Sequence, residues 1–73
     1  MHFDRHIHMG DKLCSELLVG LKQAISSLSG GQVLKVTAHA PGAGEDIKGW
    51  CELTEHRFLG RNGDEYFIQV KEA

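Results

Sequence analysis

Apolar and polar residues alternate at the start of the chain. Phe3, Arg5, Ile7 and Met9 fall on one side of this alternation. A period of two residues is typical of a strand that buries one of its faces. We therefore predict a strand over residues 2–9, with these four side chains on the same face of a sheet.

The next segment has the spacing of an amphipathic helix. Its apolar residues recur every three or four positions and form one stripe, made of Cys14, Leu17, Leu18, Leu21, Ile25 and Leu28. Asp11, Cys14 and Ser15 are alternative N-cap residues, and each places Cys14 within one turn of the helix start. Gly30 and Gly31 end the helix, because glycine readily adopts the left-handed conformation that closes a last turn.

The second half of the chain predicts three more strands and one more helix. Their predicted bounds are Val33–Ala40 for a strand, about Glu45–Thr54 for the helix, and Arg57–Arg61 and Glu65–Lys71 for two strands. Pro41 and the glycines after it form a turn, and Asn62-Gly63 is a favourable hairpin turn because both residues tolerate positive φ.

This order of elements predicts the fold class. Strand, helix, strand, helix, strand, strand is the order of an α+β two-layer sandwich. The simplest packing is a four-stranded mixed sheet with both helices on one face. The other face of the sheet would then lie in water. We expect the 73 residues to form a single domain.

Composition excludes several classes of partner. The net charge is −2, and the eight basic residues are scattered, which argues against nucleic acid held by bulk charge. No apolar stretch is long enough to span a membrane, and the N-terminus lacks the apolar core of a signal peptide. Two cysteines do not make a disulfide scaffold. We therefore expect a cytoplasmic protein with reduced thiols and no membrane partner.

Cys14 is the first candidate for chemistry. The first turn of a helix has unpaired backbone N–H groups and a positive dipole end, and both favour a thiolate, the form of sulfur that attacks electrophiles. Lys12 should favour the thiolate and Glu16 should oppose it, so we expect a modest lowering of the pKa of Cys14. The alternative is that Cys14, which continues the apolar stripe, is a small buried residue.

Cys51 and His56 are weaker candidates. Cys51 is expected in the core beside Trp50, itself a predicted core anchor, and the alternative is a thiol that closes a disulfide with Cys14. His56 is expected as a hydrogen-bonded residue at a strand entrance, with a catalytic base as the alternative. We expect no metal site and no cofactor, because Cys14, Cys51 and His56 lack zinc-ligand spacing.

Two blocks of sequence resemble the TusA/SirA family of small sulfur carriers. The first is Cys14–Leu17, which reads Cys-Ser-Glu-Leu where family members usually have Cys-Pro-x-Pro. The second is Ala40–Cys51, which ends in Asp-Ile-Lys-Gly-Trp-Cys where the family has Asp-Ile, two residues, an aromatic residue and often cysteine. His56 matches a histidine that follows in the family. The resemblance covers nearly the whole chain and implies the same element order.

The resemblance implies a function as a relay of sulfane sulfur. Cys14 would carry the sulfur as a persulfide, which makes the chain a sulfurtransferase-type carrier if it is active. Its partners would be a sulfur-donor protein, either a cysteine desulfurase or rhodanese-like, and an acceptor protein. The possible accessory residues are Lys12, Ser15, Glu16, Cys51 and His56.

The chain departs from the family pattern at three positions. Ser15 and Leu17 replace the two motif prolines, and Ala40 replaces an aspartate. Proline fits a first helical turn because its φ is fixed at a helical value, so we expect its loss to loosen this turn. Two alternatives therefore stay open: a binding or regulatory module that kept the fold without the relay, and a redox switch between Cys14 and Cys51.

Overall fold

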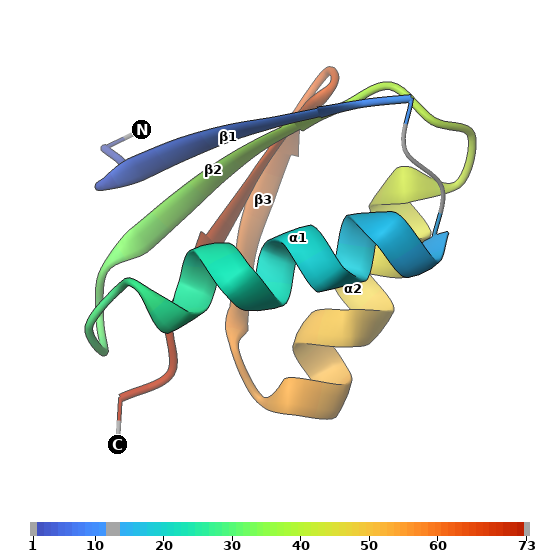
Figure 1. Cartoon of the computed structure of the whole chain (residues 1–73). Coiled ribbons are helices and arrows are strands. Elements are labelled where there is room, and N and C mark those ends of the chain that lie inside the picture. Colours follow the sequence, from blue (N-terminus) through green and yellow to red (C-terminus); the bar gives the residue numbers. More distant parts are fainter. Residues whose placement is uncertain (1, 12–13, 73) are drawn as a thin grey trace.

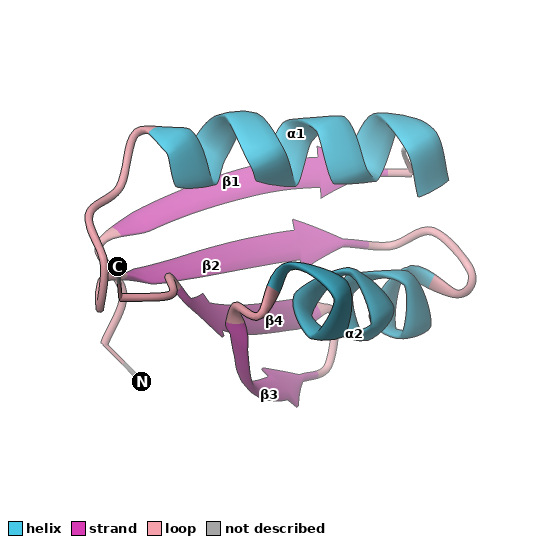
Figure 2. Ribbon diagram, turned by 90° about the horizontal axis from the view of Figure 1, so that it is seen from below, coloured by secondary structure: helices cyan, strands magenta, loops and turns pink. Residues whose placement is uncertain are grey.

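The computed structural model describes residues 2–11 and 14–72, except for the side chain of Cys14. It has the predicted order of elements (Figure 1). The elements are β1 Arg5–Gly10, α1 Cys14–Ser26, β2 Val33–Ala38, α2 Ala43–Thr54, β3 Arg57–Asn62 and β4 Glu65–Gln69. The four strands form one mixed sheet, and both helices cover the same face of it (Figure 2). The predicted α+β two-layer sandwich is confirmed.

The sheet order brings the starts of both helices to one end of the molecule. The order is β1-β2-β4-β3, with β1 parallel to β2 and β4 antiparallel to β2 and β3. Because β1 and β2 are parallel, their carboxyl ends lie at the same edge of the sheet. α1 follows β1 and α2 follows β2, so each helix begins near that edge (Figure 1).

The core lies between the helices and the sheet. Both helices and two of the strands, β2 and β4, contribute the largest fully buried side chains, which are Leu17, Leu21, Leu34, Val36, Ile47, Cys51 and Ile68. The alternation predicted for the second strand is confirmed, because its inner residues are all buried: Leu34, Val36, Ala38 and Ala40. This shared interior holds α1 and α2 in place on the sheet.

Phe3 does not lie on the predicted face. The strand begins only at Arg5, and the ring of Phe3 meets the ring of His6 edge-on, with centroids 5.7 Å apart. The Lys35 ammonium lies 4.9 Å from the Phe3 ring centroid and 6.0 Å from that of Phe67. Phe67 is buried without belonging to the core cluster. The face of the sheet away from the helices is therefore partly covered, whereas we predicted it to be wet.

Several element boundaries differ from the predictions. β3 ends at Asn62 and β4 at Gln69, rather than at Arg61 and Lys71. α1 ends at Ser26, although its apolar stripe continues to Leu28, which packs partly buried against the core. α2 begins at Ala43, two residues before the predicted start, because Gly42 adopts a left-handed conformation with φ of 80° immediately before it. β2 ends at Ala38 rather than at residue 40.

Two helical leucines test which packing stabilises the fold. Leu21 of α1 is fully buried and Leu53 of α2 is 83% exposed. Leu21→Ala should lower the free energy of unfolding by about 2–5 kcal/mol, because it removes buried methyl groups and leaves a cavity. Leu53→Ala, the same chemical change at the surface, should alter it by no more than about 0.5 kcal/mol. Urea unfolding measures both, and equal effects would contradict the assignment of the core.

Candidate functional site

Cys14 is the first residue of α1, which agrees with the prediction that it lies within one turn of the helix start. It therefore belongs to the turn whose backbone N–H groups have no partner within the helix. Asp11 lies outside the helix and Ser15 inside it. Lys12 and the side chain of Cys14 lie outside the described residues, so the effect of Lys12 on the thiol stays a prediction.

Ser15 and Glu16 follow Cys14 in the same turn, and both are exposed. Glu16 is the acidic residue of this first turn, where the helix dipole favours a negative charge and so stabilises the helix. The same carboxylate disfavours a thiolate beside it. The modest lowering of the pKa of Cys14 that these opposing effects would produce stays a prediction.

Leu17 holds the first turn of α1 to the core. It occupies the position of the second motif proline and has no exposed surface. The helix nevertheless begins at Cys14 without either proline. Burial of a leucine side chain contributes about 1.5–3 kcal/mol, so packing replaces the conformational restriction that proline would impose. The complete burial of Leu17 therefore argues against the expectation that this turn is loosened.

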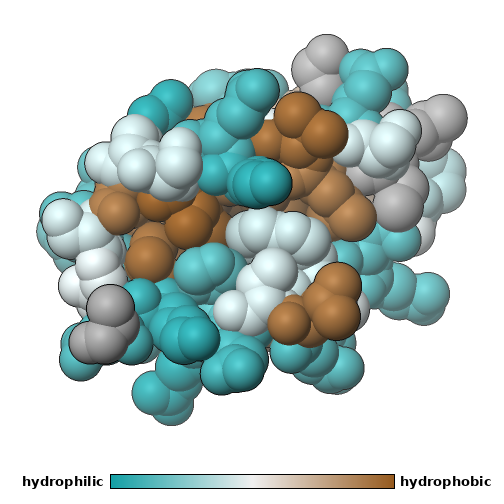
Figure 3. Space-filling model, turned by 60° about the horizontal axis from the view of Figure 1, so that its bottom comes forward, coloured by the Kyte–Doolittle hydropathy of each residue, from teal (hydrophilic) through white to brown (hydrophobic). Residues whose placement is uncertain are grey.

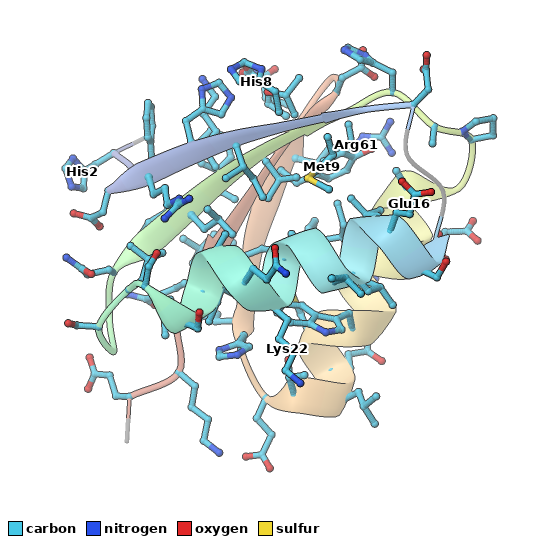
Figure 4. All side chains as sticks on the ribbon, viewed as in Figure 1. His2, His8, Met9, Glu16, Lys22 and Arg61 are labelled. Carbon is cyan, nitrogen blue, oxygen red and sulfur yellow. The ribbon has the colours of Figure 1, made fainter. Side chains whose placement is uncertain are left out.

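A groove of about 490 Å³, which the sequence pattern did not predict, runs beside the start of α1. Its lining comes from β1 and α1: Met9, Ser15, Glu16, Val19, Gly20 and Gln23. Met9 points from β1 toward α1 (Figure 4) and packs on Gly20, where an added Cβ would lie 2.9 Å from the methionine sulfur. Val19 is 56% exposed, and apolar atoms reach the surface on the helix side (Figure 3).

Hydrogen bonds tie together the end of the sheet from which the helices start. The N–H of His39 donates to the carbonyl of Gly10 over 2.8 Å, and the N–H of Ala38 donates to the carbonyl of Asp64 over 3.0 Å. The imidazole Nδ1 of His39 also lies 2.8 Å from the carboxylate of Asp64. These hydrogen bonds join the ends of β1 and β2 to the β3–β4 turn. They therefore stabilise the end of the sheet from which both helices start.

Cys51 lies in the core, as expected. It is on α2 and is 1% exposed. Burial, followed by the nearby charge of Glu52, raises the pKa of the Cys51 thiol to about 11. Such a thiol is almost entirely protonated at neutral pH and is a poor nucleophile. This buried position favours a structural role for Cys51 in the core over a role as the thiol that closes a disulfide with Cys14.

His56 is held at the entrance of β3, away from the start of α1. Its Nδ1 accepts a hydrogen bond from the backbone N–H of Lys71 over 2.9 Å, so the neutral ring carries its proton on Nε2. The ring stacks on Trp50, with centroids 5.3 Å apart. Because α2 has 12 residues, it separates His56 from the helix starts by about 18 Å. Trp50 is only partly buried and packs against the core cluster, so the predicted core anchor lies at the border of the core.

Residues 2–11 and 14–72 contain no group of three histidine, cysteine or acidic side chains placed to hold a metal ion. Neither helix in these residues is long and apolar enough to cross a membrane.

Comparison with protein families shows a match over most of the chain. The family model described as sulfurtransferase TusA matches residues 7–72. The chain belongs to the TusA family. The match includes Cys14, Cys51 and His56, and it agrees with the resemblance carried by the two sequence blocks. Family membership supports a general role as a sulfur carrier that works with sulfur-transfer partners.

The burial of Cys51 predicts that its thiol is protected. In Cys14→Ser, where Cys51 is the remaining cysteine, a thiol-alkylating reagent should leave the native protein unmodified at neutral pH, because the thiol is buried and protonated. The same protein in denaturant should be fully alkylated, as measured by intact mass. Equal rates in the two states would contradict the core position of Cys51.

The hydrogen bond to His56 predicts a loss of stability in acid. Desolvation, followed by the charge of Lys71, lowers the pKa of His56, so the unfolded chain takes up this proton first. The contribution of His56 is complete above about pH 6.5 and is lost as the pH falls below it. Urea unfolding should therefore show stability that declines from pH 7 to pH 5.

The matched variant is His56→Gln, which has no imidazole to titrate. Its decline over the same interval should be shallower than that of the wild type. It should not vanish, because the pKa of His6 is also lowered, first by desolvation and then by His8 and Lys35. An identical decline in both proteins would show that His56 does not contribute.

Proposed function

We propose that this protein relays sulfane sulfur as a persulfide on Cys14, between a donor protein and an acceptor protein. The observation that carries the proposal is the position of Cys14 as the first residue of α1, inside the segment that matches the TusA family. The other cysteine is buried and protonated. Cys14 is therefore the cysteine suited to sulfur exchange.

The loading step needs no oxidant. The thiolate of Cys14 attacks the outer sulfur of a persulfide R–S–SH on the donor protein. A new S–S bond forms at Cys14, the S–S bond of the donor breaks, and its electron pair leaves with the donor sulfur as a thiolate. The products are Cys14–S–SH and R–S⁻. Transfer onward repeats the exchange with a thiolate of the acceptor.

The first turn of α1 suits this reversible exchange. A thiol of very low pKa is mostly ionised but is a weak nucleophile, whereas an unperturbed thiol is mostly protonated at neutral pH. Unpaired N–H groups at the helix start favour the thiolate, and the carboxylate of Glu16 disfavours it. The balance favours a thiol that accepts sulfur and also releases it.

The groove beside Cys14 suits a protein partner. It is lined by residues of β1 and α1 that include the exposed Val19, and Ser15 and Glu16 of the first turn form part of its wall. A partner that fills it would bring its own cysteine to the helix start. We propose a cysteine desulfurase or a rhodanese-like protein as the donor, and the reducing cytoplasm as the compartment in which Cys14 stays a thiol.

The replacement of both motif prolines supports a second candidate, a binding module without the relay. Leu17 is fully buried where the family has its second proline. The first turn of α1 therefore has a packing role that does not depend on sulfur transfer. In that case partner binding would survive Cys14→Ala unchanged, and no sulfur would be transferred.

Intact mass after exposure to a persulfide donor tests the relay directly. The reduced protein should gain the mass of one sulfur atom, and a thiol acceptor should then remove it. Cys14→Ser should gain none, because the attacking sulfur is absent.

Cys51→Ala is the matched control and should load like the wild type, provided that circular dichroism shows it folded. An equal adduct on Cys14→Ser would contradict the assignment of the carrier residue. No adduct on the wild type, under conditions that load another TusA-family protein, would favour the binding module.

A further inference from the structure

Two histidines of β1 lie together on the side of the sheet away from the helices. His6 and His8 are two residues apart, so their side chains share one face of the strand. Their ring centroids are 4.1 Å apart, at an interplanar angle of 43°. Figure 4 shows His8 pointing away from the helices. The relay of sulfur through Cys14 uses neither residue.

The separation of the rings suits a shared metal ion. Imidazole nitrogen binds transition metals at about 2.0–2.1 Å, so two nitrogens on neighbouring positions of one ion lie roughly 3 Å apart. The ring centroids lie 4.1 Å apart, so rotation of the two side chains would bring a nitrogen of each ring toward a common ion. His8 is exposed and His6 is half-buried, so an ion has access from solvent.

A second contact orients His6. Its Nε2 lies 2.7 Å from the hydroxyl oxygen of Thr37 on β2. With the Nε2–H donating to that oxygen, Nδ1 retains the lone pair that a metal needs. Histidines that bind metals are commonly held in this way, by a hydrogen bond from the other ring nitrogen.

Charged side chains near His6 and His8 affect how strongly the pair would bind a cation. Lys35 lies beside His6 in the register of the two strands, and its ammonium would repel a cation. That ammonium is 3.0 Å from the carboxylate of Glu65, which offsets its charge.

We propose that His6 and His8 chelate one divalent transition-metal ion of the imidazole-preferring class, Cu²⁺, Ni²⁺ or Zn²⁺. Within the described residues no third histidine, cysteine or acidic side chain joins the pair, so water or an outside ligand fills the remaining positions. A structural zinc site uses four protein ligands, and this site is therefore an exchangeable one. The order of affinity for divalent ions gives Cu²⁺ the tightest binding.

Calorimetric titration with Ni²⁺ tests the site, with Cys14→Ser as the parent protein so that this thiol does not compete. The parent should bind one ion. His6→Gln and His8→Gln should each weaken binding by about tenfold or more, since loss of a direct ligand costs at least as much as loss of an outer-shell partner. His8 is exposed, so His8→Gln should fold normally and is the decisive variant.

Two other histidines supply the controls. His39→Gln removes an exposed imidazole paired with Asp64, and His2→Gln removes one near Asp4. Both should bind Ni²⁺ as the parent does. Paramagnetic broadening by Ni²⁺ should centre on the amides of β1 and of β2 opposite it. Unchanged affinity in His8→Gln, or a loss confined to His39→Gln or His2→Gln, would overturn the proposal.

Discussion

The packing of α1 on the sheet is the interaction on which the rest of the structure depends. A helix of 13 residues is marginal in water by itself, so burial of its apolar side must hold it. Leu17 and Leu21 have no exposed surface and lie in one core cluster with Leu34 and Ile68. This packing fixes the start of the helix at Cys14. The position of the candidate sulfur carrier is thus a consequence of core burial one turn further along.

The fold places the two cysteines at different positions, one at a helix start and one in the core. Cys51 is on α2 inside the core, where desolvation raises the pKa of its thiol. Cys14 is the first residue of α1, where we expect unpaired backbone N–H groups to favour the ionised form. The parallel pairing of β1 with β2 brings both helix starts to one edge of the sheet, and the bond from Ala38 to Asp64 joins that edge to the β3–β4 turn.

Periodicity predicted the elements, their order and the two layers, because the helical stripe and the strand alternation record which side chains are buried. It also placed Cys14 in a first turn. It misplaced Phe3, because the chain before a strand is free to cross to the other face. The groove depends on the contact of Met9 with Gly20, and the partner of His56 is a backbone N–H 15 residues away. Contacts of this kind arise only when separate elements pack.

The rate at which Cys14 is alkylated as a function of pH tests the central claim most directly. In Cys51→Ala this rate reports one thiol, and its midpoint is the pKa of Cys14. We predict a midpoint below the value of about 8.5 for a free cysteine, and a return to that value when the protein is unfolded in urea. A native midpoint at or above the unfolded one would show that the start of α1 does not activate the sulfur.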